Sequence, residues 1–79
     1  TTIPLLDTGK VASMHDMFQN CTSLSDESLN NILAMCKNAT SYSDTKTLAY
    51  IGLTEEQANK CKTLSNYSAF TTAGWTTGY

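Results

Sequence analysis

Three cysteines and one histidine carry the most reactive side chains of this chain. Cys21, Cys36 and Cys61 each fall on the apolar face of an expected helix, where free cysteines commonly act as small buried hydrophobic groups. A disulfide between Cys36 and Cys61 is the alternative, but spacing alone does not show whether its geometry is possible. Because the sequence has no Cys-x-x-Cys motif, a redox thiol is disfavoured.

The single histidine and the paired acidic residues do not point to a reaction. His15 and the cysteines, at positions 15, 21, 36 and 61, lack the regular spacing of zinc ligands. The pairs Asp26-Glu27 and Glu55-Glu56 fall in the first turns of expected helices, where the helix dipole accounts for acidic residues. We therefore expect no enzyme, no metal site and no cofactor.

Charge is scarce in this sequence. Only 15% of its 79 residues are charged, the net charge is −2, and every basic residue is a lysine. Binding of nucleic acid requires a basic surface, so it is excluded as a function. No apolar run approaches the roughly 20 residues of a membrane span.

A chain this short rarely builds a core that contributes more than a few kcal/mol to the free energy of unfolding, so a stabilising partner is expected.

Aromatic residues gather in the second half of the chain. We expect Tyr50, Tyr67 and Trp75 to cover a small core, because large aromatic rings bury much area. Tyr42 falls in a polar loop and Tyr79 in a tail expected at the surface. Aromatic rings with a polar group favour binding surfaces, so these two are candidate binding residues.

The first half of the chain predicts a strand and two helices. Residues Ile3–Asp7 form an apolar run that contains a proline, which limits it to an edge strand. After it, apolar residues at i, i+3, i+4 and i+7 predict a helix over Met14–Cys21. The same spacing, behind the capping residue Ser25, predicts a helix over Asp26–Lys37.

The second half predicts further short helices. We expect one over Thr45–Ile51 and another from Glu55 to about Thr63, which the capping box Thr54-x-x-Gln57 would start. A last turn or two would follow Ser65 and end near Ala73. The predicted fold class is therefore an α-rich α/β fold, with one short edge strand followed by four or five short helices. Its expected core is Met14, Met17, Phe18, Cys21, Leu29, Ile32, Leu33, Cys36, Cys61, Phe70 and Trp75.

The first 24 residues resemble one repeat of the BspA-like leucine-rich repeat surface proteins. That repeat reads Leu-Asp-Thr-Ser-x-Val-Thr-x-Met-x-x-Met-Phe-x-x-Cys-x-Ser-Leu, and this sequence departs from it at Gly9 and Ala12. The remainder is similar to the C-terminal tails that follow such repeats in gut-bacterial and prophage surface proteins. The matching positions are Leu6, Asp7, Thr8, Val11, Met14, Met17, Phe18, Cys21, Ser23 and Leu24.

The resemblance implies an architecture and a role. Residues 1–24 would be the last repeat of a solenoid, and residues 25–79 its helical cap, packed with the repeat as one unit. Proteins of this kind act in adhesion or receptor binding at a bacterial cell surface or on a virion, and so outside the cell. The partners would be upstream repeats or neighbouring chains, and a host protein or glycan. The binding face would include Ile3 and Leu5.

One other reading of function remains open from the sequence. A small structural subunit could self-assemble into an oligomer or fibre through its exposed strand edge or through helix packing.

Overall fold

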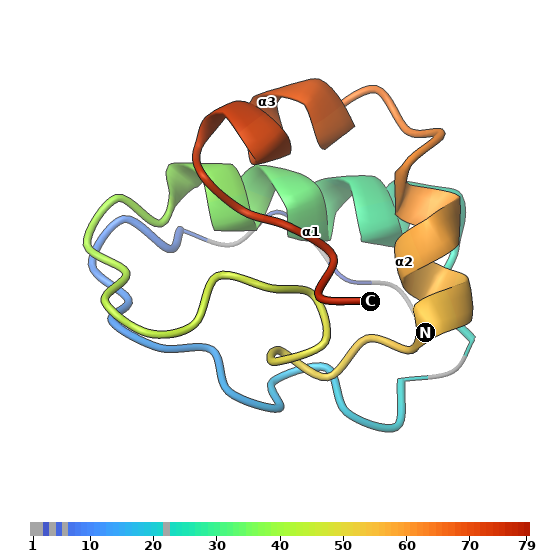
Figure 1. Cartoon of the computed structure of the whole chain (residues 1–79), viewed down its shortest axis with the longest axis horizontal. Coiled ribbons are helices and arrows are strands. Elements are labelled where there is room, and N and C mark those ends of the chain that lie inside the picture. The colour runs from blue at the N-terminus through green and yellow to red at the C-terminus, as the bar shows by residue number, and fades with distance from the viewer. Residues whose placement is uncertain (1–2, 4, 6, 22) are drawn as a thin grey trace.

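Helix α1 (Asp26–Asn38) is the central element, and α2 (Glu55–Cys61) and α3 (Tyr67–Thr72) both pack against it (Figure 1). The computed structural model describes residues 3, 5, 7–21 and 23–79 and measures 28 × 23 × 23 Å. In this part of the chain, β pairing is limited to one isolated parallel bridge, between Thr47 and Thr76. The predicted α/β class with four or five helices is therefore wrong, because the described residues form a small domain with three helices.

Local signals account for α1 and α2. The Ser25 side chain accepts a hydrogen bond from the Ser28 N–H and caps α1, whose inward face carries buried apolar residues. At α2 the predicted capping box is present: Thr54 and Gln57 bond each other's backbone N–H groups. Both helices begin at the expected residue, although α2 ends at Cys61 rather than near Thr63.

Helix α3 is held by a pair of asparagines. The Asn66 backbone N–H donates to Asn30 Oδ1 (2.9 Å), and the Asn66 side-chain amide donates to the Asn30 carbonyl (3.1 Å). The Asn30 amide also donates to Ser65 Oγ (3.2 Å). Because α3 is only six residues long, it depends on such contacts and on the burial of Phe70 for its stability.

The predicted helix over Met14–Cys21 is wrong. This segment is a series of turns, with Asp16 (φ 54°) and Asn20 (φ 67°) in the left-handed region. The N–H groups of Asp16 and Phe18 donate to the carbonyls of Tyr50 and Ile51 (3.0 and 2.9 Å). Hydrogen bonds to a distant segment thus replace the i to i−4 bonds of a helix.

The predicted helix over Thr45–Ile51 is also wrong, and the C-terminal residues are not a free surface tail. The Thr76 N–H donates to the Lys46 carbonyl, and the Leu48 and Ala49 N–H groups donate to the Thr76 and Thr77 carbonyls (all 3.1 Å). In Figure 1 the C-terminal segment crosses in front of α1 before it ends. These three hydrogen bonds connect the loop after α1 to the C-terminal segment.

The N-terminal segment is tied to a helix. Of the expected strand Ile3–Asp7, residues Pro4 and Leu6 lie outside the described part, and the other three are assigned to no strand. The Ile3 N–H donates to Ser28 Oγ (2.9 Å), and the Ile3 carbonyl accepts from the Asn31 side-chain amide (3.0 Å). At Ile3 the backbone therefore bonds side chains of α1 and not a neighbouring strand.

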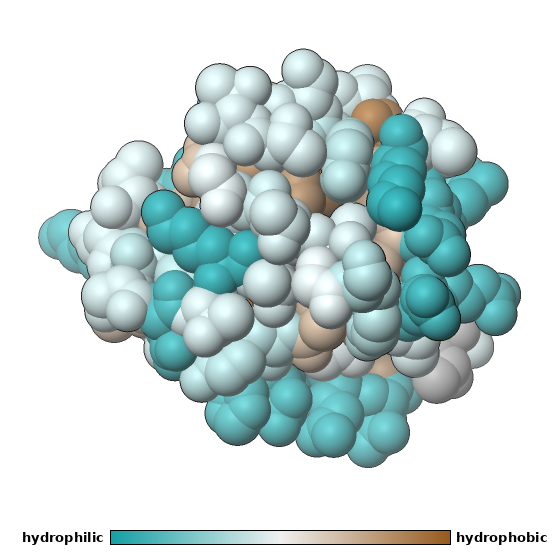
Figure 2. Space-filling model, viewed as in Figure 1, coloured by the Kyte–Doolittle hydropathy of each residue, from teal (hydrophilic) through white to brown (hydrophobic). Residues whose placement is uncertain are grey.

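One apolar cluster joins the turns of the N-terminal half to all three helices. Of the expected core, Met17 is misplaced, because its side chain is 45% exposed, and Cys21 is only half-buried. The core also buries Met35 and Tyr42, which were not expected there. The face in Figure 2 is mostly white and teal with small brown areas. The remaining expected core residues are buried: Met14, Phe18, Leu29, Ile32, Leu33, Cys36, Cys61, Phe70 and Trp75.

Within the described residues, no helix is both long enough and apolar enough to cross a membrane.

Candidate functional site

Tyr42, expected on a surface loop, lies in the core. It is 7% exposed, and its ring packs against Trp75 with a centroid separation of 4.7 Å. Its hydroxyl donates to the Thr45 carbonyl (3.0 Å) and accepts from the Met14 N–H (3.5 Å). The expectation that Tyr42 is a surface binding residue is therefore wrong, since its ring is packed and its hydroxyl is occupied.

Tyr79, the other aromatic candidate, remains at the surface. Its side chain is 57% exposed, but its hydroxyl donates to the Leu53 carbonyl at 2.6 Å. Two contacts hold the Tyr79 ring in place: this hydrogen bond, and the bond from the Ala49 N–H to the Thr77 carbonyl two residues before it. A partner would meet a fixed ring face and not a mobile tail.

Two further large apolar side chains are exposed, and both belong to the N-terminal segment. Leu5 is 57% exposed and Met17 is 45% exposed. We call residues 5–17 the N-terminal ribbon, of which residue 6 is outside the described part. Met14 anchors the ribbon in the core, and Ile3, just before it, is half-buried. The ribbon is thus held in place while Leu5 and Met17 face outward.

Asp44 is the acceptor at the centre of a polar cluster beside the ribbon. One carboxylate oxygen accepts from Ser13 Oγ (2.7 Å) and Tyr50 Oη (3.1 Å), and the other accepts from the Thr45 N–H (2.8 Å). These bonds, that from Ser13 first, lower the pKa of Asp44 below its ordinary value. The bond to Asp44 in turn raises the pKa of the Tyr50 hydroxyl.

His15 completes the Asp44 cluster through stacking. Its ring lies on that of Tyr50 with centroids 4.4 Å apart, and its Nε2 is 3.3 Å from an Asp16 carboxylate oxygen. Ser13 directs its hydroxyl to Asp44, so the hydroxyl proton is not shared with the His15 ring as nucleophilic catalysis requires. This arrangement supplies stacking and hydrogen bonds, which hold the ribbon to the loop after α1.

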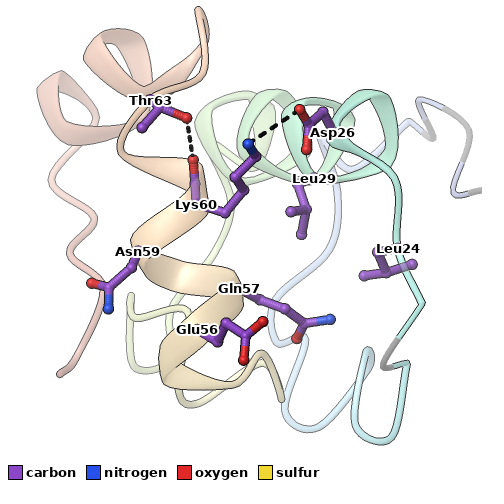
Figure 3. Close-up of a pocket in the computed structure, with 8 residues that line it drawn as sticks. All are labelled: Leu24, Asp26, Leu29, Glu56, Gln57, Asn59, Lys60 and Thr63. Atoms are coloured by element: carbon purple, nitrogen blue, oxygen red, sulfur yellow. Dashed lines mark hydrogen bonds and ion pairs between the residues drawn. The ribbon is translucent and has the colours of Figure 1, made fainter.

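An open cavity of about 430 Å³ lies between α1 and α2 (Figure 3). We call it the α1–α2 groove. Leu24 and Leu29 form its apolar part, and an ion pair between Lys60 Nζ and Asp26 Oδ2 (3.5 Å) spans from one helix to the other. The groove is lined by Leu24, Asp26, Leu29, Glu56, Gln57, Asn59, Lys60 and Thr63.

Gln57 links the groove wall to the N-terminal half. Its side-chain nitrogen donates to the Cys21 carbonyl (2.5 Å), while its oxygen accepts from the Thr54 N–H (3.0 Å). Because its amide nitrogen and oxygen both have partners within the protein, Gln57 has a structural role. The charged side chains that line the groove are Asp26, Glu56 and Lys60.

The three cysteines are free thiols in this structure, including the pair expected as a possible disulfide. Cys36 and Cys61 are buried, and burial raises the pKa of both thiols, that of Cys61 to about 12. Since the thiolate is the reactive form, neither has the environment of a reactive cysteine. In the described part of the chain no three His, Cys, Asp or Glu side chains lie close enough to hold a metal ion.

Sequence reasoning missed both the Asp44 cluster and the α1–α2 groove. Ser13 and Asp44 are 31 positions apart, and Asp44 stands alone in a polar loop with no motif around it. Glu56 was noted only as an acidic residue in the first turn of a helix, so no local signal marked it as a groove residue.

Comparisons with protein-family models, with curated proteins and with solved structures find no match to this chain.

Proposed function

We propose that this chain is a non-enzymatic interaction module that forms the end of a longer surface or phage-tail protein, and that it docks through the N-terminal ribbon. The main observation in support of this proposal is the exposure of Leu5 and Met17. Among the described residues only one other large apolar side chain, Tyr79, is comparably exposed. Exposed apolar side chains that form one patch are a mark of protein contact surfaces, and the proposal requires Leu5 and Met17 to belong to one such patch.

The ribbon is suited to docking around Met17, because the residues there are already ordered. Met14 and Phe18 are buried on either side of the exposed Met17, and the N–H groups of Asp16 and Phe18 are bonded to the loop after α1. A pre-ordered segment loses little conformational entropy on binding. Association that buries Met17 therefore gains from its apolar area at little entropic cost.

The resemblance to BspA-like repeats supports the same face. In stacked repeats each unit buries its surface against its neighbours, so an end unit presents one uncovered side. Met17 belongs to the Met-x-x-Met-Phe-x-x-Cys spacing of the repeat, yet it is exposed in this chain. A preceding repeat would cover it. The longer protein would act in adhesion or receptor binding outside the cell.

The test places one, two or three copies of residues 1–24 before the chain and compares their thermal unfolding. A Gly/Ser segment of equal length serves as the control. Each added copy should raise the Tm, and the change Leu5→Glu with Met17→Glu in the original chain should remove most of that gain. A Tm that is the same with added copies and with the Gly/Ser segment would contradict the proposal.

Self-assembly is the second candidate, because the same exposed side chains could bind another copy of the chain. Light scattering across a range of concentrations separates the two. A chain that stays monomeric at high concentration excludes a self-assembling subunit. Oligomers that dissociate in the Met17→Glu variant would favour self-assembly.

A further inference from the structure

We propose that the α1–α2 groove binds a basic side chain, arginine or lysine, presented by a partner protein. The groove shares no residue with the N-terminal ribbon, so this binding site is independent of the docking function proposed above. The inference rests on three properties of the groove: its apolar part, its charge and the exposure of its ion pair.

The apolar part fits the hydrocarbon stem of a basic residue. Leu24 is half-buried at the edge of the cavity and offers apolar surface there, while Leu29, only 3% exposed, lies beneath it as part of the lining. Figure 3 shows both side chains facing the space beside α2, from which Lys60 and Gln57 also project. Lysine and arginine place their methylene groups on such surfaces while the charged end stays in water.

The charged groups of the groove carry a net negative charge. Two carboxylates, Asp26 and Glu56, line it together with one cation, Lys60. Lys60 pairs with Asp26, while Glu56 forms no ion pair with any described residue. A cation that enters the groove therefore meets a carboxylate, Glu56, that is paired with no cationic side chain among the described residues. An anionic ligand would face both carboxylates and a lysine already engaged.

The resident ion pair does not close the groove. The Lys60 and Asp26 side chains are 52% and 62% exposed, and their nitrogen and oxygen are 3.5 Å apart. Exposed pairs of this kind contribute little free energy because water screens them. An incoming ammonium or guanidinium group can thus replace Lys60 beside Asp26 at small cost.

The test is an NMR titration of the whole ¹⁵N-labelled chain with N-acetyl-arginine amide and N-acetyl-lysine amide, against the uncharged N-acetyl-glutamine amide. At least one basic probe should give saturable shifts at Leu24, Leu29, Glu56 and Lys60, and these should weaken as salt is added. The proposal is overturned if the neutral probe binds equally well, or if the basic probes shift only residues outside the groove.

Two neighbouring glutamates supply a matched control. Glu55 and Glu56 both lie in the first turn of α2, but only Glu56 lines the groove. Glu56→Gln should weaken binding of the basic probe by about two- to fivefold, and Glu55→Gln by clearly less. Lys60→Gln should strengthen it, because the competing cation is gone. Equal weakening by the two glutamate variants, or weaker binding by Lys60→Gln, would overturn the assignment.

Discussion

The Ser13 hydroxyl donates a 2.7 Å hydrogen bond to the Asp44 carboxylate across 31 positions of sequence. Tyr50 donates to the same oxygen, and His15 stacks on Tyr50, so one carboxylate joins the N-terminal ribbon to the loop after α1. The surface that we propose for docking is therefore held by a polar contact as well as by Met14 and Phe18 in the core.

Asp44 should make stability depend on acidity. Its pKa is lowered in the folded protein, chiefly by the Ser13 hydrogen bond, so the folded state favours the carboxylate. The resulting stabilisation is present above the ordinary pKa of about 4 and is lost as the pH falls through the lowered folded value. Asp44→Asn should lower the Tm at pH 7 but make little difference at pH 2.

Thermal unfolding between pH 7 and pH 2 checks this. The difference in Tm between the natural chain and Asp44→Asn isolates this carboxyl from the six other acidic side chains, since both proteins share them. A difference that stays constant down to pH 2 would show that the Asp44 charge plays no part.

Gly52 should tolerate no side chain. Its φ is +105°, and a Cβ at this position would lie 2.5 Å from the Gln19 nitrogen and 2.8 Å from its Cα. Gly52→Ala should therefore lower the free energy of unfolding by well over about 1 kcal/mol, because both backbone strain and a clash with main chain result.

Gly74 is the matched control for that experiment. Its φ is +94°, but nothing lies within 4 Å of the position that an alanine methyl group would take, so Gly74→Ala adds backbone strain alone. Urea unfolding should rank Gly52→Ala as the more damaging change. Equal losses would show that close approach to the backbone at Phe18 and Gln19 is not what requires a glycine at position 52.

The cysteines should differ in reactivity. Cys36 and Cys61 are buried with raised pKa values, about 12 for Cys61, whereas Cys21 is half-buried. Because thiolates react and access is required, iodoacetamide at pH 8 should label Cys21 first in the folded protein. Mass spectrometry of the labelled peptides gives the order, and urea should abolish it. Faster labelling of Cys36 or Cys61 in the folded state would contradict the burial described above.

Asn30 should be important for the attachment of α3. It bonds Ser65 and both the backbone and the side chain of Asn66. Asn30→Ala should cost about 1–2 kcal/mol of unfolding free energy, because two side-chain bonds disappear and the Asn66 N–H loses its acceptor. Asn59→Ala, on the exposed side of α2, is the control and should cost much less in the same urea measurement.

The candidate sites were only partly accessible to prediction. Tyr79 was expected at the surface as part of a tail, and Leu5 as part of the binding face that the repeat resemblance implies; both are exposed. Tyr42 was also expected at the surface, but its ring packs against Trp75. The two residues are 33 positions apart, so no local sequence pattern indicates this contact. The groove likewise exists only because α2 packs beside α1, and the sequences of the two helices do not predict how they pack.

The sequence by itself determined the helices whose signals are local. Ser25 and the Thr54–Gln57 capping box start α1 and α2, and apolar spacing selects the buried face of α1. Tertiary structure decided the segments Met14–Cys21 and Thr45–Ile51, which share helical spacing but form no helix. Their backbone groups bond each other and the C-terminal residues, and such long-range partners outweigh the weak propensity of a short helix.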